Sequence, residues 1–215
     1  MKHLKHFKTF EAVIMPSDTE DNSVVNSFDS AVEFGQRNDF DVVDYETFYN
    51  SLGDEDKKTA PPKVGVPFFA LFHPINNRPM FVISDSNILN FIPNFREVMV
   101  DIIGHEKVHA EQSKRRGGLV FKLPNPMDRK AYFSNKEEIM AFSYTIANGL
   151  YKYNTDIKSA MNDLLSNTQS QGRPPEYKII WDDINKYCDE KIIKRYRKYI
   201  YMYLDEIFNK IKKEY

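Results

Sequence analysis

Residues 105–109 read His-Glu-Lys-Val-His, a run that constrains both the local fold of this chain and its chemistry. Residues four apart on a helix lie on one face, so the two imidazoles could bind one metal ion through their neutral nitrogens. Glu106 would then lie where it can take a proton from a metal-bound water. The pattern therefore predicts a metal site on a helix. The alternative is two helical histidines that are satisfied by ordinary hydrogen bonds.

The residues around this motif predict a helix from about 95 to 116. Asn94 is a favoured N-cap, and Glu97 follows it in the capping-box position. Basic residues at 114–116, followed by glycine, are typical of a helix C-terminus. Apolar residues recur at helical spacing, at Val98, Met99, Ile102 and Ile103. Both histidines lie near this apolar face on a helical wheel, so we expect them to point toward the body of the protein.

A catalytic zinc site usually has a third protein ligand and an open position for water. The only cysteine, Cys188, lies in a distant polar stretch, and residues 134–142 hold a better candidate. Ser134 as N-cap would place Glu137 in the capping-box position, facing solvent. Glu138 lies nearer the expected apolar face, so we assign it as the third ligand in preference to Glu137. That face is formed by Ile139, Phe142, Ile146 and Leu150. The alternative is that both glutamates are ordinary first-turn acids favoured by the helix dipole.

These two segments together resemble a known family of enzymes. His105-Glu106-x-x-His109, followed by Glu-x-x-Ala at 138–141, looks like the gluzincin type of zinc metallopeptidase. It is especially similar to small bacterial and phage-encoded members with a short gap between the two helices. The longer run through Gln112 also looks like the H-E-x-x-H-x-x-Q of several such proteins. The resemblance covers about a quarter of the chain, residues 94–147.

The resemblance implies Zn²⁺ held by His105, His109 and Glu138, with Glu106 as the general base. It implies an α+β, zincin-like fold, with a small sheet or hairpin next to the motif helix and a helical C-terminal half. The implied activity is hydrolysis of peptide bonds in a protein or peptide substrate by a zinc-bound water. Rival interpretations are a hydrolase acting on another bond, or a catalytically inactive zincin-like protein that binds a host or virion partner.

Two apolar runs, residues 63–73 and 78–85, predict a β-hairpin just before the motif helix. Pro67 indicates that one of these strands lies at an edge or carries a bulge. A hairpin in this place fits the resemblance, because zincins typically have a sheet beside the first metal helix.

Three further side chains are candidates for stabilising an oxyanion or contacting substrate. Tyr132 lies just before the third-ligand helix, Tyr144 lies within it, and His73 ends the first apolar run. Phenol and imidazole groups can donate a hydrogen bond to developing negative charge. The alternative for each of them is packing.

Pro61 and Pro62 mark the predicted boundary between an acidic N-terminal segment, residues 1–60, and the metallopeptidase domain, residues 61–215. Residues 17–56 carry 12 acids and a single base, Arg37. This stretch fits a partly ordered acidic insert, a segment covering a cationic metal site, or a solvated surface with one or two short helices. It could also belong to the same domain as the rest.

The remainder of the chain predicts helices at about 156–166, 176–188 and 189–213. The last of these is strongly amphipathic and tyrosine-rich and carries eight Lys or Arg. Its basic face could contact RNA, a membrane or a partner, although a packed helix with a solvated basic face is the more common meaning of such a pattern.

Composition limits the partners and the compartment. The net charge of −1 argues against broad electrostatic binding of nucleic acid. One cysteine excludes an internal disulfide and suits a reducing compartment. Neither a membrane-spanning run nor the apolar core of a signal peptide is visible. We therefore expect no membrane partner and a cytoplasmic location, in the host cytoplasm or the virion if the protein is phage-encoded.

Overall fold

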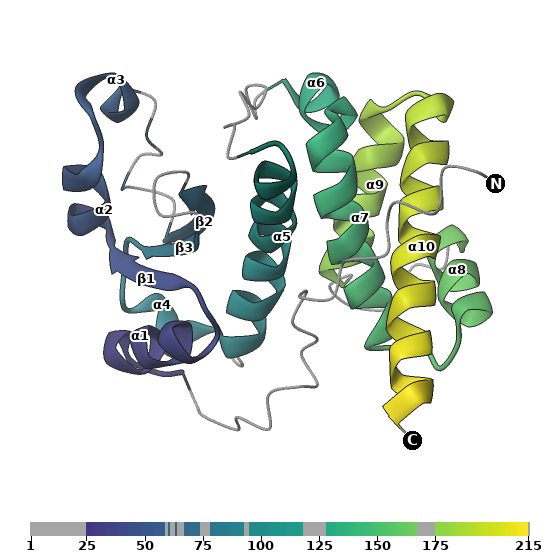
Figure 1. Ribbon diagram of the computed structural model, residues 1–215, viewed down its shortest axis with the longest axis horizontal. Coiled ribbons are helices and arrows are strands. Elements are labelled where there is room, and N and C mark those ends of the chain that lie inside the picture. The colour runs from purple at the N-terminus through teal and green to yellow at the C-terminus, as the bar shows by residue number, and fades with distance from the viewer. Residues whose placement is uncertain are drawn as a thin grey trace. The chain divides into compact units, whose positions relative to one another are not determined.

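The chain forms two compact units, residues 1–118 and 119–215, which are drawn in Figure 1. The first unit combines helices with a β-sheet, and the described part of the second is built from helices, so the fold class is α+β. The computed structural model describes residues 25–58, 60, 63, 67–73, 78–92, 95–117, 128–166 and 175–214.

The sheet of the first unit has the strand order β1-β3-β2, formed by β1 (Asp41–Asp44), β2 (Phe68–His73) and β3 (Arg78–Ile83). Strands β2 and β3 pair antiparallel, so the predicted hairpin is confirmed. Its expected turn at 74–77 lies outside the described residues. The strand that follows Pro67, β2, is at an edge of the sheet, as that proline indicated.

Strand β1 was not predicted. It pairs in parallel with β3, with Val42 opposite Phe81. It lies within the acidic stretch, so residues on both sides of position 60 contribute to one sheet. The part of this stretch that the structure describes is therefore folded into the first unit.

Strand β3 is buried on both faces, as its continuous apolar run from Met80 to Ile83 would require. Phe81 and Ile83 point into one apolar cluster, and Met80 and Val82 into another. The second cluster includes Phe48 of helix α2 (Tyr45–Ser51), which packs on β1 and β3.

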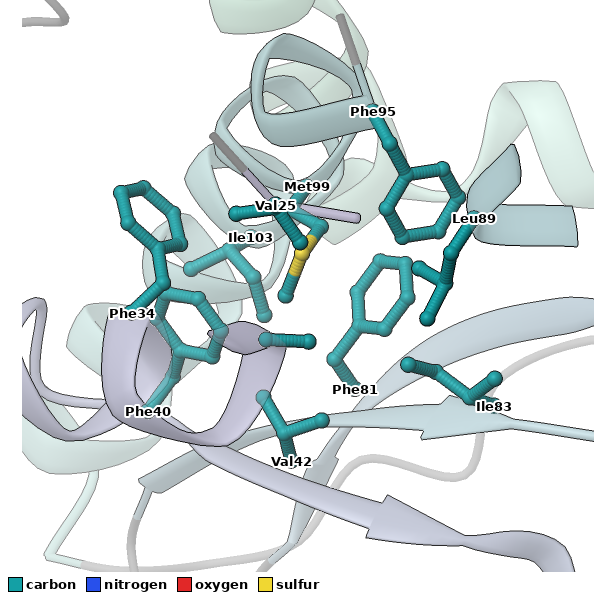
Figure 2. Packing of buried hydrophobic residues seen from close by; sticks show 11 residues of the cluster. Val25, Phe34, Phe40, Val42, Phe81, Ile83, Leu89, Phe95, Met99 and Ile103 are labelled. Atoms are coloured by element: carbon teal, nitrogen blue, oxygen red, sulfur yellow. The ribbon is translucent and has the colours of Figure 1, made fainter. Parts of the chain in front are cut away.

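The first cluster lies between the sheet and two helices, α1 (Phe28–Arg37) and α5 (Phe95–Arg115). Two short helices, α3 (Asp54–Lys57) and α4 (Ile88–Phe91), complete the first unit. Figure 2 shows how side chains from the helices and from the strands meet in this cluster. Its labelled members are Val25, Phe34, Phe40, Val42, Phe81, Ile83, Leu89, Phe95, Met99 and Ile103.

The second unit is arranged around helix α7 (Lys136–Tyr151). This helix packs against α6 (Arg129–Ser134), α8 (Ile157–Leu165), α9 (Glu176–Tyr187) and α10 (Glu190–Glu214). The three helices predicted after residue 155 are confirmed to within two residues at each end. The buried stripe of α10 is formed by Ile193, Tyr196, Ile200, Tyr203, Leu204, Ile207 and Phe208.

Among the helices that the structure describes, none has the length and apolar content needed to cross a bilayer.

Candidate metal centre

The motif helix α5 forms as its sequence predicts, from Phe95 to Arg115. Its predicted N-cap, Asn94, lies outside the described residues. At the other end Gly117 has φ +72, and its N–H donates to the carbonyl of Lys114. This is a helix end at which glycine is favoured, because the left-handed conformation costs it little. Its buried residues are Phe95, Met99, Ile103, Gly104, Val108, His109, Gln112 and Ser113.

The two histidines of the motif face each other on α5. The Nε2 atoms of His105 and His109 are 3.2 Å apart, and the rings are inclined by 75°. Two imidazole nitrogens bound to one tetrahedral zinc at about 2.05 Å would be about 3.3 Å apart. The spacing within this pair therefore fits the two nitrogens that would share one ion. His109 is buried, with 4% of its surface exposed, and His105 is half-buried.

Gln112 supplies a contact that the sequence analysis did not assign. Its Oε1 lies 3.1 Å from Nδ1 of His109. An amide oxygen only accepts hydrogen bonds, so Nδ1 of His109 is the nitrogen that carries hydrogen in this contact. The lone pair of His109 is then at Nε2, the nitrogen that faces His105. The sequence could have indicated this contact, since Gln112 follows His109 by three residues and residues three apart on a helix share a face.

Lys107, within the motif, ties α5 to the turn between α1 and β1. Its Nζ donates to the carbonyl of Asn38 at 2.9 Å. Burial lowers the pKa of Lys107 to about 8, although the neighbouring Asp39 acts in the opposite direction. Asp39 itself has φ 61, a left-handed conformation that is uncommon outside glycine. This contact, too, was not predicted from the sequence.

Glu106 follows His105 on the same helix and is half-buried. A helical carboxylate next to a metal-binding histidine is in the position expected of a general base. Its role as a general base stays a prediction.

The expected third ligand, Glu138, lies in the first turn of α7, in the second unit. The predicted N-cap was wrong. Ser134 ends the short helix α6, and Asn135 caps α7 by accepting a hydrogen bond from the backbone N–H of Glu137 at 2.9 Å. The start of α7 is therefore one residue later than expected, which moves Glu138 to the third helical position.

The exposure predicted for Glu137 was also wrong. Glu137 is 9% exposed and Glu138 is fully buried. A helical wheel with a single buried face does not describe α7, because this helix is covered by other helices around most of its circumference. Burial strengthens the attraction of a carboxylate for a cation, and it does so most for Glu138.

The three side chains predicted to stabilise an oxyanion belong to different elements. Tyr144 is buried in α7, with its ring edge-on to Tyr203 at 5.6 Å. Tyr132, on α6, is half-buried and contacts the ring of Phe142 at 5.8 Å. His73 ends β2, and its side chain lies outside the described residues. Both tyrosines have the aromatic contacts expected of packing, and a role in catalysis stays a prediction for all three.

Comparison of this chain with protein-family models, with curated proteins and with solved structures gives no match. The resemblance to gluzincins thus rests on the motif residues themselves. The contacts on α5 and the burial at the start of α7 are the structural observations that bear on it.

Proposed function

We propose that this protein is a zinc-dependent metallopeptidase of the gluzincin type, with a zincin-like arrangement of its metal helices. The observation that carries the proposal is the His105–His109 pair, whose Nε2 atoms are 3.2 Å apart on one helix. Glu106 accompanies the pair in the position of a general base. Gln112 contacts Nδ1 of His109, the buried histidine of the pair.

The proposed ligand set is His105, His109 and Glu138. His105 and His109 come from the first unit and Glu138 from the second. Two imidazoles and one carboxylate suit zinc, and a three-ligand set leaves one coordination position open for water. Ca²⁺ and Mg²⁺ prefer sets built from oxygen atoms, so the donor chemistry favours zinc over either of them.

In this proposal Glu106 takes a proton from the attacking water and returns it to the leaving amine of the peptide. Gln112 keeps the His109 ring oriented, and Lys107 joins the motif helix to the turn before β1. A zinc ion held by these residues would supply Lewis-acid chemistry, which would polarise the scissile carbonyl and lower the pKa of the water. A protein or peptide is the proposed substrate.

The first test is the metal content of the purified full-length protein, measured by elemental analysis for wild type and His109→Ala. We expect about one zinc per wild-type chain and loss of that zinc in the variant, because His109 is the most buried imidazole of the pair. Absence of metal from the wild type after incubation with zinc salts would contradict the proposal. A zinc content unchanged by the substitution would contradict the site.

The second test is peptide hydrolysis. A library of quenched fluorescent peptides is incubated with the zinc-loaded wild type and with Glu106→Gln at equal metal content. Cleavage by the wild type alone is the expected result. A protein that binds zinc and cleaves no peptide would favour the inactive, partner-binding alternative instead.

A further inference from the structure

We infer that Gln112 is a positioning residue that fixes the tautomer of His109, so that Nδ1 carries the hydrogen and Nε2 presents its lone pair. The consequence for metal binding rests on the proposed function. The tautomer itself can be measured in the metal-free protein and does not depend on that function.

The contact between the two side chains is well suited to this role. Gln112 Oε1 and His109 Nδ1 are 3.1 Å apart, and the exposed fractions of the two residues are 7% and 4%. A buried hydrogen bond has little competition from water, so it selects one tautomer more strongly than an exposed one would. The two residues are three apart on α5, which keeps the glutamine on the histidine's own face of the helix.

The second nitrogen of His109 makes the assignment more specific. Its Nε2 faces His105 Nε2 at 3.2 Å. A neutral imidazole has one donor and one acceptor nitrogen. With hydrogen on Nδ1, His109 accepts at Nε2, and the hydrogen between the rings belongs to His105. The metal-free protein should therefore hold two different tautomers, Nδ1–H in His109 and Nε2–H in His105.

Because of this difference, the two histidines would not undergo the same change when a metal binds. His109 already carries its lone pair at Nε2 and needs no change of tautomer. His105 must move its hydrogen from Nε2 to Nδ1 before Nε2 can coordinate. Gln112 thus makes His109 the preorganised member of the pair, and loss of Gln112 should weaken metal binding without touching a ligand. Outer partners of metal-binding histidines commonly contribute about 10- to 100-fold in metal affinity.

The tautomers are measured by long-range ¹H–¹⁵N correlation of the histidine rings in the metal-free, full-length protein at about pH 8, above the ordinary pKa of histidine. We expect the Nδ1–H pattern for His109 in the wild type and its loss in Gln112→Met, which keeps the size of the side chain and removes the acceptor. Gln112→Glu retains an acceptor oxygen and should retain the pattern. An Nε2–H pattern for His109 in the wild type would overturn the inference.

Zinc affinity is then measured by competition with a chromophoric chelator. Gln112→Met should bind zinc about 10- to 100-fold more weakly, and Gln112→Glu should restore most of the affinity. Gln36→Met makes the same chemical change at an exposed position of α1 and serves as the matched control. Equal affinity for Gln112→Met and wild type would refute the positioning role.

Failure of the proposed function looks different from failure of this inference. A wild type that binds no zinc would contradict the metal site, while the tautomer pattern would still decide the role of Gln112. If Gln112→Met does not fold, the wild-type tautomers and the Gln112→Glu variant still test the inference.

Discussion

The two units bury their central helices in different ways. Helix α5 of the first unit buries 8 of its 21 residues, whereas α7 of the second unit buries 11 of its 16, around most of its circumference. A partly buried helix gives some indication of its orientation in its sequence, because its apolar and polar residues tend to separate on the helical wheel. A helix covered on all sides does not, and its polar residues are buried together with its apolar ones. The His pair was therefore predictable in detail, while the surroundings of Glu138 were not.

The units also differ in charge. Residues 1–118 contain 13 basic and 18 acidic residues, a formal charge of −5, and residues 119–215 contain 17 and 13, a charge of +4. The net charge of −1 for the whole chain conceals this difference. The argument from net charge against nucleic-acid binding therefore applies less well to the second unit taken alone.

The largest expected effect concerns the chemistry on α5. Glu106→Gln should keep zinc at the wild-type level and lower the rate of peptide hydrolysis by about 10²- to 10⁴-fold, because it removes a general base. Steady-state kinetics at equal metal content measure it. Turnover at the wild-type level would show that another group acts as the base.

The next test compares the two glutamates of α7. Glu138→Ala should weaken zinc binding by more than about 100-fold, which exceeds the usual effect of an outer partner. Glu137→Ala should change zinc binding much less, because Glu137 is not a proposed ligand. Chelator competition on both variants gives the ranking. The opposite ranking would identify Glu137 as the ligand.

A third test compares packing in the two units through their glycines. A Cβ at Gly35 would lie 2.7 Å from Cγ2 of Val42 and 2.9 Å from the carbonyl oxygen of Phe40, and one at Gly149 would lie 2.8 Å from Cβ of Tyr177. Alanine at either position should lower the free energy of unfolding by about 1–3 kcal/mol, as overpacked cores do.

Urea denaturation measures this loss. Gly53→Ala is the control, since the nearest atom to its added Cβ, Oδ2 of Asp56, is 3.6 Å away. Equal stability for all three variants would contradict the close packing of Gly35 and Gly149.

The smallest effect concerns the cap of α2. Hydrogen bonds from the side chain and backbone of Thr47 lower the pKa of Asp44 below its ordinary value. The folded pKa is then below the unfolded one, so this stabilisation is complete above the unfolded pKa of about 4 and is lost as the pH falls through the folded pKa.

Asp44→Ala should lower the free energy of unfolding by about 1 kcal/mol at neutral pH, which is the usual contribution of an N-cap. This loss of stability should be smaller in acid, where Asp44 of the wild type is protonated. Thermal unfolding between neutral pH and pH 3 measures both. A cost independent of pH would show that the charge of Asp44 contributes nothing to the cap.

The predictable parts of the fold were those with local signals. Helix α5, the hairpin of β2 and β3, and the amphipathic α10 each carry their own periodicity and end signals. Strand β1 has four residues, Asp-Val-Val-Asp, and it is recognisable only through its parallel partner, which is more than thirty residues away. Parallel pairing leaves little local trace in the sequence.

In the candidate site, too, the features with a local signal in the sequence were the predictable ones. His105, Glu106 and His109 follow from the motif, and the contact of Gln112 with His109 could have been found from its spacing on the same helix. The contact of Lys107 with the Asn38 carbonyl could not, because it joins residues 69 positions apart. The burial of Glu137 depends on the helices that surround α7, and no local pattern predicts it.

The burial of β3 has a consequence for solubility. Its segment Met-Phe-Val-Ile is uncharged and strongly favours extended structure, a composition that promotes aggregation when it is left uncovered. β1 covers one edge of this strand, and its own sequence begins and ends with aspartate. Charged residues on an outer strand discourage another molecule from adding to the sheet. We therefore expect the short acidic strand β1 to protect β3 from pairing with strands of other molecules.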